Sequence, residues 1–452
     1  MASHVIDMIM LKNNFGTEEM REVWSDKNRL QKHLDVEAAL AEAEGELGVI
    51  PEKAAEVISL HSDVSMFNIE EIAKEVLRLK HSLTPTINAM QKLCGEYGEY
   101  VHYGVTTQDV VDTGAMLQLK EANKIIVREL KDVCKELIKL AEKYKTVPIA
   151  GRTHGMQALP TTFGFKMTVV LSELSRHLER LKQSEERVFT GVIAGAVGTY
   201  ASFGERGMDV EKLTLGKLGL NVPQICWHSS RDRISEYADI IELISGTLGK
   251  LGNEFYNLMR TEINEIEEPF SKGKIGSSTM PQKRNPAAFE GLSSLTRPIF
   301  HSTSLIHESL IVEHERDAVS WRAEWIALPE ICIYISSQLA SAKAVLKGLV
   351  VKPENMLKNL NMQGGLIMSE RILFELGKKL GKQTAHHLVY EMAMDSFENK
   401  KPFKEVLMNN VQVTSILSEE KIDELLDSKT YLGLAVQKVD KVLDEIKKSG
   451  LV

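Results

Sequence analysis

One short loop of the chain combines the residue types needed to bind a carboxylate and to move a proton. It reads Gly-Ser-Ser-Thr-Met-Pro-Gln-Lys-Arg-Asn-Pro over residues 276–286. Glycine and the turn at the proline free backbone N–H groups for an anion-binding concavity, to which Lys283 adds a charge and Asn285 an amide donor. The hydroxyl of Ser277 or Ser278 could act as a base once deprotonated. An ordinary surface turn is the alternative for a single Gly-Ser-Ser tripeptide, but eleven such positions in order favour a functional loop.

This run resembles the signature loop of the fumarase/aspartase superfamily, which includes adenylosuccinate lyases, argininosuccinate lyases and 3-carboxymuconate cycloisomerases. In that superfamily the first serine removes a proton beside a carboxylate, and fumarate leaves when the neighbouring C–N, C–O or C–S bond breaks. The resemblance implies that Ser277 is the base and that Ser278 contacts the substrate. Lys283 and Asn285 would hold the carboxylate as negative charge grows on it, which is when preorganised donors contribute most to rate.

A hydroxyl-rich run, Gly-Val-Thr-Thr-Gln-Asp at residues 104–109, leads into a long helical pattern. Threonine or aspartate at such a position can simply cap the helix, which is the stronger explanation from the residues alone. N–H groups and hydroxyls at a helix start also attract a carboxylate. The matching stretch contacts the substrate in adenylosuccinate lyases, so the resemblance implies substrate-binding roles for Thr106 and Thr107.

A histidine lies between glycines and close to an arginine in Gly-Arg-Thr-His-Gly-Met-Gln at residues 151–157. Histidine is the side chain best suited to give a proton near neutral pH, and a structural histidine in a connecting loop is the alternative. This run also resembles adenylosuccinate lyase. The resemblance implies that His154 is the general acid, that Glu290 orients it, and that Thr153 and Gln157 contact the substrate.

A second histidine, His81, matches the place of another active-site histidine in adenylosuccinate lyases. That family has an arginine before this histidine and an aspartate after it, whereas Lys80 and Ser82 stand here. The matching position predicts that His81 contacts the substrate, and the two departures leave a place on a helical surface as the alternative.

The residues expected to set specificity divide between two branches of the superfamily. Arg316 belongs to a His-Glu-Arg-Asp run like that of adenylosuccinate lyases, but Trp321 and Trp325 replace a serine and an arginine that this family uses on its substrate. The run Trp-Arg-Ala-Glu-Trp resembles the cycloisomerases. Core or interface anchors are the alternative for such large aromatics. If they line the pocket, they disfavour a phosphate, and Arg231, Arg316 and Arg322 remain for a second carboxylate.

Composition restricts the class of protein. The chain has 452 residues, 43% of them hydrophobic and 26% charged, and a formal net charge of -8, which gives no support for a nucleic-acid partner. Its four cysteines have no spacing typical of a disulfide framework or a zinc site. The first residues lack a basic stretch followed by a long apolar run, so we expect a cytoplasmic protein. Neither a metal nor an organic cofactor is implied.

Long proline-poor helical patterns dominate the chain, and we predict an all-α fold. The patterns cover residues 28–48, 113–145, 163–187, 235–265, 287–309 and 328–349. They predict three domains, namely an N-terminal helical domain (1–110), a central long-helix bundle with the signature loop (111–350) and a C-terminal helical domain (351–452). The apolar residues are too many for one seam, which favours an oligomer. The resemblance implies a homotetramer of three-domain fumarase/aspartase-type chains with shared active sites.

The predicted function is the release of fumarate from a succinyl-substituted substrate, a small dicarboxylate, by anti β-elimination. Adenylosuccinate is the leading substrate. A small succinylated amine or thiol such as S-(2-succino)cysteine is an alternative, and so is the cycloisomerisation of 3-carboxymuconate. A structural protein that has lost activity, like the lens crystallins of this superfamily, is the alternative of another class. The joint presence of Ser277, Lys283, Asn285, His154 and Glu290 argues against it.

Overall fold

The chain packs into two compact units in a computed structural model that describes residues 3–270, 273 and 276–452. Unit 1 comprises Met1–Leu130, His177–Gly249 and Ser293–Ser341, and unit 2 comprises Lys131–Arg176, Lys250–Leu292 and Ala342–Val452. The long helices contribute one part to each unit; they are α7 (Thr107–Lys143), α8 (Phe163–Val188), α10 (Asp232–Met259) and α13 (Ala318–Gly348). The division into domains 1–110, 111–350 and 351–452 stays a prediction.

The predicted mostly helical fold is confirmed, with two differences that involve proline. The expected helix 287–309 is broken at Leu295 into α11 (Ala287–Ser294) and α12 (Thr296–Glu308). Pro298 has no N–H to donate to the carbonyl four residues earlier, which explains a break at this point. The last long helix was predicted to begin at residue 328, but α13 begins at Ala318 and continues through Pro329. A proline inside a helix costs about 3 kcal/mol, which packing must offset.

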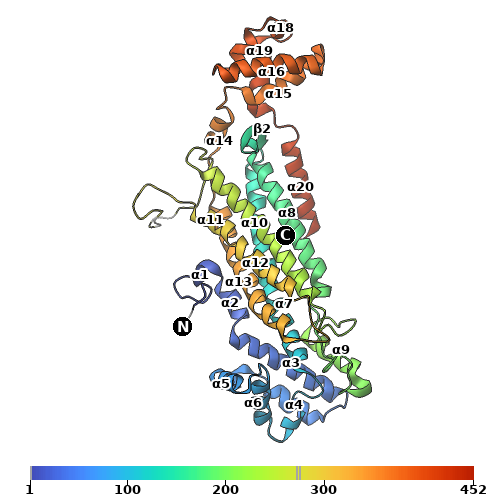
Figure 1. The fold of residues 1–452 in the computed structure, drawn as a ribbon. Helices are drawn as coiled ribbons and strands as arrows, with labels where there is room; N and C mark the ends of the chain where they lie inside the picture. Colours follow the sequence, from blue (N-terminus) through green and yellow to red (C-terminus); the bar gives the residue numbers. More distant parts are fainter. Residues whose placement is uncertain (1–2, 271–272, 274–275) are drawn as a thin grey trace. The chain divides into compact units, whose positions relative to one another are not determined.

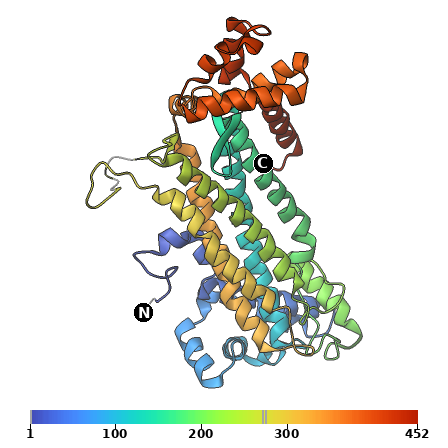
Figure 2. The same cartoon turned by 45° about the horizontal axis from the view of Figure 1, so that its top comes forward.

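Unit 1 contains parts of the long helices side by side with shorter ones (Figures 1 and 2). Buried aromatic and polar contacts join the long helices: the rings of Phe189 and Tyr237 meet edge to face at 6.3 Å, and Gln338 donates to the Ser245 carbonyl at 3.2 Å. The shorter helices are α1 (Lys12–Phe15), α2 (Glu18–Val23), α3 (Asp26–Glu46), α4 (Glu52–Leu60), α5 (Ile69–Leu79), α6 (Thr84–Cys94), α9 (Gly207–Leu218) and α12.

Unit 2 adds short strands to the helical fold. Strands β1 (Pro148–Thr153) and β2 (Met156–Thr162) form an antiparallel hairpin, and β3 (Ile266–Glu267) pairs with β4 (Val350–Val351). The helices that follow are α14 (Pro353–Leu360), α15 (Ser369–Leu380), α16 (Lys382–Glu398), α17 (Phe403–Met408), α18 (Val411–Thr414), α19 (Glu419–Leu426) and α20 (Ala435–Ser449). Helices α15 to α19 share an apolar cluster around Phe403 and Leu376.

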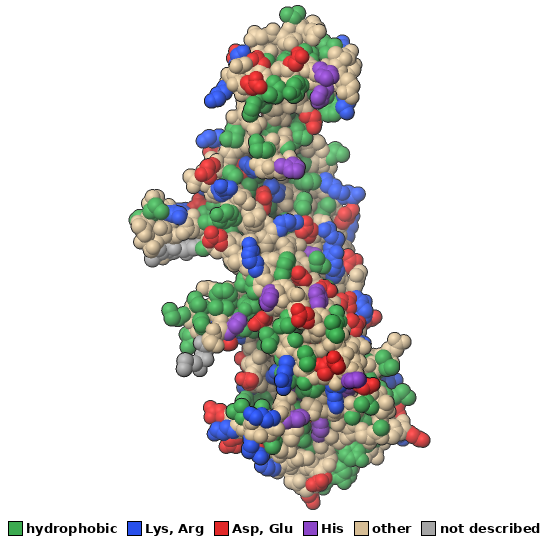
Figure 3. Space-filling view, viewed as in Figure 1, with side chains coloured by type: hydrophobic (Ala, Val, Ile, Leu, Met, Phe, Trp, Pro, Cys, Tyr) green, Lys and Arg blue, Asp and Glu red, His purple; other side chains and the backbone are tan. Residues whose placement is uncertain are grey.

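The surface mixes charged and apolar side chains on the face drawn in Figure 3. Helices of unit 1 expose large apolar side chains, among them Leu243 on α10, Phe300 on α12 and Ile326 on α13. Within the described residues, every helix is either too short or too polar to cross a bilayer.

Candidate active site

The hydroxyl oxygen of Ser277 is held by the backbone of its own loop. Ser277 Oγ accepts hydrogen bonds from the N–H groups of Thr279 at 3.3 Å and Met280 at 3.1 Å. Hydrogen bonds donated to an oxygen stabilise its negative charge and lower its affinity for a proton. This geometry therefore suits the predicted role of Ser277 as a base.

The two ends of the signature loop come together where two backbone segments approach each other closely. A side chain at Gly276 would collide with the carbonyl oxygen of Lys283, so the loop needs glycine at this position. Next to this closure, Arg284 forms an ion pair with Glu267 and lies 4.4 Å from the centre of the Phe270 ring. Both contacts fix the end of the loop to the rest of unit 2.

The other predicted residues of this segment are exposed and point at no partner. In the part of the chain that the structure describes, the side chains of Ser278, Lys283, Asn285 and Glu290 form no hydrogen bond or ion pair. Helix α11, which carries Glu290, is capped by Glu268, whose carboxylate accepts from two backbone N–H groups of the first turn at 2.7 and 2.9 Å. The segment thus exposes polar side chains next to a helix start that Glu268 caps.

His154 lies at the tip of the β1–β2 hairpin. His154 and Gly155 form the two-residue turn with φ values of 53° and 80°, as both positions of such a hairpin turn require. His154 and Thr153 are exposed. No hydrogen bond joins His154 to Glu290 among the described residues, so this pairing stays a prediction.

The hairpin itself is anchored by a buried ion pair. Arg152 donates to both oxygens of Glu265, at 2.9 and 2.7 Å, and Asn359 donates to the same carboxylate at 3.0 Å. Gln157 donates its amide N–H to the Asn359 carbonyl at 2.9 Å. The side-chain oxygen of Gln157 is buried and accepts no hydrogen bond from the described residues. The anchoring keeps the hairpin rigid below the exposed histidine.

Unit 1 brings together three segments that are far apart in the sequence. Arg316 donates to the hydroxyl of Thr106 at 2.6 Å, and Nε2 of His81 lies 3.5 Å from the hydroxyl of Thr107. Nδ1 of His81 accepts from the N–H groups of Leu83 at 3.3 Å and the next residue at 3.0 Å. Because Nδ1 accepts, the proton of the neutral ring lies on Nε2 and faces Thr107. His81, Thr106, Thr107 and Arg316 thus form one polar cluster at the start of α7.

A buried pair that the sequence analysis missed supports this cluster. One oxygen of Asp109 accepts from the backbone N–H groups of Thr106 at 3.0 Å and Gly195 at 2.9 Å, and the other accepts from Ala194 at 3.1 Å and His228 Nε2 at 2.9 Å. Burial opposes a charge on His228, but the hydrogen bond to Asp109 outweighs it and raises the pKa of His228 to about 9. The capping role expected of this aspartate is confirmed by the hydrogen bond from the Thr106 N–H, whereas its pairing with His228 has no local sequence signal.

Arg231 does not have the role that the sequence analysis offered it. Its buried guanidinium donates to Asp112 at 2.8 and 3.1 Å and to Glu324 at 2.8 Å, so both edges are occupied by carboxylates inside unit 1. Arg231 is therefore structural, and the prediction that it is available for a substrate carboxylate was wrong. Arg322 is exposed.

The two tryptophans pack together beside a cavity. The rings of Trp321 and Trp325 lie 6.0 Å apart, and Trp325 lines a cavity of about 440 Å³ in unit 1. The Arg29 guanidinium lies over the ring of Trp325, 4.4 Å from its centre. Trp325 is thus a pocket residue, whereas Trp321 packs behind it.

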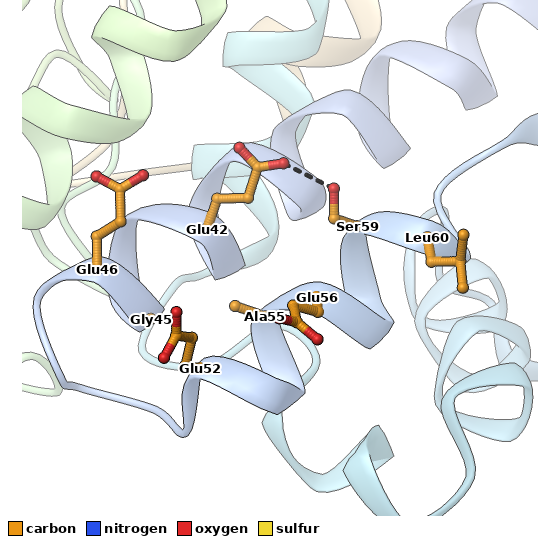
Figure 4. Close-up of a pocket in the computed structure, with 8 residues that line it drawn as sticks. All are labelled: Glu42, Gly45, Glu46, Glu52, Ala55, Glu56, Ser59 and Leu60. Atoms are coloured by element: carbon orange, nitrogen blue, oxygen red, sulfur yellow. Dashed lines mark hydrogen bonds between the residues drawn. The ribbon is translucent and has the colours of Figure 1, made fainter.

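A second hollow, between α3 and α4, contains none of the predicted residues (Figure 4). It is lined by four glutamates; Ser59 donates to Glu42 at 2.7 Å, and Lys217 forms ion pairs with Glu42 at 3.4 Å and Glu46 at 2.5 Å. No group of three or more metal-ligating side chains is suitably arranged in the described part of the chain. The polar clusters that match the predictions therefore remain the candidate site.

Comparisons with known proteins agree on the family. A model of the lyase family matches residues 13–300, and a model of the adenylosuccinate lyase C-terminus matches residues 365–442. Two bacterial proteins named N-acetyl-S-(2-succino)cysteine lyase are similar to the chain: that of Dickeya dadantii is 60% identical, with 100% of both chains covered, and that of Enterococcus italicus is 59% identical, with 100% of this chain and 99% of the relative covered.

More distant relatives include members of the two branches whose motifs the sequence resembles. The adenylosuccinate lyase of Methanocaldococcus jannaschii is 41% identical over 99% of this chain and 96% of its own. The structure of 3-carboxy-cis,cis-muconate lactonizing enzyme from Pseudomonas putida superposes with a TM-score of 0.90 at 34% identity, covering 96% of this chain and 98% of that one. The chain therefore belongs to the fumarase/aspartase superfamily and is a fumarate-forming lyase that breaks a carbon–nitrogen or carbon–sulfur bond.

Proposed function

We propose that the chain releases fumarate from an N-acetylated, S-succinylated cysteine by breaking the carbon–sulfur bond. The observation that carries this proposal is the 60% identity over the full length to an N-acetyl-S-(2-succino)cysteine lyase, compared with 41% to an adenylosuccinate lyase. It favours the succinylated thiol, an alternative in the sequence analysis, over adenylosuccinate, the leading substrate there.

The environment of Trp325 supports the same choice. A nucleotide substrate carries a phosphate, for which a bidentate arginine is the preferred partner. Here an indole ring lines the cavity at the position where adenylosuccinate lyases have an arginine, and a second indole packs 6.0 Å behind it. Apolar surface of this kind suits the methylene, thioether and acetyl groups of a small substrate.

The chemistry assigns one step to each predicted group. Ser277, as an alkoxide stabilised by two N–H groups, removes the proton from the carbon beside the succinyl carboxylate. Lys283 and Asn285 hold that carboxylate while charge builds on it. The electron pair then forms the double bond of fumarate, and the carbon–sulfur bond breaks with its electrons going to sulfur. His154 protonates the departing thiolate.

We also propose that the active enzyme is a homotetramer with sites shared between subunits. The polar cluster at the start of α7 lies in unit 1, whereas His154 and Ser277 lie in unit 2. The catalytic side chains Lys283, His154 and Glu290 are exposed in the single chain, and the bundle helices expose large apolar side chains. Assembly would bury these apolar faces and complete each site.

The experiment that tests the function measures fumarate release by ultraviolet absorbance. The substrates are N-acetyl-S-(2-succino)cysteine, S-(2-succino)cysteine and adenylosuccinate, each with the wild type and with Ser277→Ala. We expect the highest kcat/KM for the N-acetylated thioether and a loss of at least about 100-fold in the variant. A higher kcat/KM for adenylosuccinate would contradict the proposal and make the chain a purine enzyme.

A further inference from the structure

The cavity beside Trp325 has an apolar wall and a cationic end. It lies among α2, α3, α7 and α13 of unit 1, with a volume of about 440 Å³, which is within the range of small-molecule sites. The apolar wall includes Trp24, Val111 and Leu328, and the cationic end is Arg29. A cavity of this composition suits a small molecule with one apolar and one anionic part.

Arg29 is a cation that no carboxylate contacts directly in the described part of the chain, although the charge of Asp26 acts on it. Within the described part of the chain its guanidinium has no hydrogen-bond acceptor and no ion-pair partner, and its contact is the ring of Trp325 at 4.4 Å. Burial lowers the pKa of Arg29, and the charge of Asp26 offsets this only in part. A half-buried guanidinium with five unused N–H donors is suited to bind a carboxylate bidentately.

Asp7 and Asp26 also line the cavity, and the remaining charged groups there are already engaged. Arg21 donates to two backbone carbonyls, at 2.9 and 2.7 Å, and to Asn13 at 2.8 Å. Asp112 and Glu324 are both held by Arg231. His33 is neutral at physiological pH, because burial and then Arg29 lower its pKa to about 3. Among the described residues that line the cavity, Arg29 is therefore the cation whose N–H donors remain open to a ligand carboxylate.

The cavity begins close to the polar cluster of the candidate site. Val111 lines the cavity and follows Thr107 by four residues on α7, which is about 6 Å along a helix. Trp325 follows Arg316, the partner of Thr106, by nine residues. Thr107 and the cavity are thus separated by about one turn of α7.

We propose that this cavity is the subsite for the thiol half of the substrate, with Arg29 binding the cysteine carboxylate and Trp325 packing against the acetyl and methylene groups. The inference rests on the proposed function and adds to it the residue that recognises the leaving group. Arg29 is a specificity-determining residue in this assignment, remote from the reacting bond.

The test compares two substrates that differ only in this carboxylate. They are N-acetyl-S-(2-succino)cysteine and S-(2-succino)-N-acetylcysteamine, in which hydrogen replaces the carboxylate. A hydrogen bond to a charged group contributes about 1.5–3 kcal/mol, so we expect the wild type to prefer the first substrate by about 10- to 150-fold in kcat/KM. Arg29→Gln should abolish this preference while kcat/KM for the cysteamine substrate changes less than about threefold.

Two further variants separate binding from folding. Arg29→Lys keeps the charge and the stacking on Trp325 and should retain part of the preference. Arg78→Gln removes an exposed arginine of unit 1 that pairs with Glu75, and should leave both values of kcat/KM unchanged. Equal losses on both substrates in Arg29→Gln would make the residue structural and overturn the assignment.

The kcat/KM values of the wild type for the two thioethers show whether the proposed subsite or the proposed function is wrong. Equal kcat/KM for both thioethers would overturn the subsite and leave the proposed function intact. The absence of fumarate release from either thioether would overturn the proposed function, and the subsite with it.

Discussion

At the scale of single residues, the demands on the acid and the base differ because the leaving group is a thiol. A thiol has a pKa near 8.5, so a thiolate leaves without a proton far more easily than an amine does. The proton beside a carboxylate is much less acidic, and its removal depends fully on the base. Ser277 is therefore expected to matter more than His154.

This difference gives a prediction for two variants. Ser277→Ala should lower kcat for the thioether by about 10²- to 10⁴-fold, the usual contribution of a general base. His154→Ala should lower it by only about tenfold, because a thiolate can still leave unprotonated when the acid is missing. Steady-state fumarate release measures both. A loss in His154→Ala as large as that in Ser277→Ala would show that proton donation limits the reaction and would favour an amine leaving group.

The buried pair of His228 and Asp109 predicts a dependence of stability on pH. The folded-state pKa of His228 is raised to about 9 from 6.5. Its contribution is fully present below pH 6.5 and is lost as the pH rises through 9. The loss corresponds to about 3 kcal/mol of unfolding free energy. Denaturant unfolding at several pH values across this window should show the decline.

The matched variant for this measurement is His228→Gln. The neighbouring Cys226 and Glu211 remain in it, so the difference between the two pH profiles isolates His228. We expect the variant to be less stable near pH 6 and to lose less stability toward pH 9. Parallel profiles would mean that His228 is neutral in the folded protein.

The residues at the site differ in how far the sequence could predict them. Ser277, His154 and Thr106 were predicted because short ordered motifs surround them, and their roles stay predictions. His228 has no motif, and its partner Asp109 is 119 positions away. Arg29 was not predicted, because its proposed role depends on the cavity that it lines and on the lack of a direct carboxylate contact among the described residues. Contacts between distant segments carry no local signal.

At the scale of elements, the signature loop depends on the closure at Gly276. A methyl group there would meet the Lys283 carbonyl and force apart the two ends of the segment that positions Ser277. The His154 hairpin shows the same dependence on backbone conformation, since its turn needs two positive φ values. The helical patterns predicted the long helices, but not this hairpin or the passage of α13 through Pro329.

The loop closure leads to a prediction with a matched glycine. Gly276→Ala should lower kcat at least about tenfold, since displacement of the base misaligns the proton transfer, with little change in melting temperature because the loop is exposed. Gly291→Ala, where nothing lies within 4 Å of the added methyl, should leave kcat unchanged and stabilise α11 slightly. Unaltered kcat in Gly276→Ala would mean that the loop tolerates opening.

At the scale of the whole molecule, the predicted substrate-binding and catalytic residues belong to different units of the chain. Arg316 and Thr106 lie in unit 1, and Ser277 and His154 lie in unit 2. In the proposed tetramer each site combines segments from different subunits. A defect in one segment can then be complemented by a second subunit that carries a defect elsewhere.

This arrangement predicts that two inactive variants restore activity when mixed. Ser277→Ala and Arg316→Ala are each expected to be inactive as homo-oligomers. If the variants are unfolded together and refolded in equal amounts, and if the two segments of a site come from different subunits, about one site in four receives both intact segments. We therefore expect about a quarter of the wild-type kcat, measured as fumarate release after refolding, and sedimentation at the tetramer mass. Refolding each variant alone is the control. A mixture as inactive as its parents would show that each site is built within a single chain, because no exchange of subunits could then reunite Ser277 with Arg316.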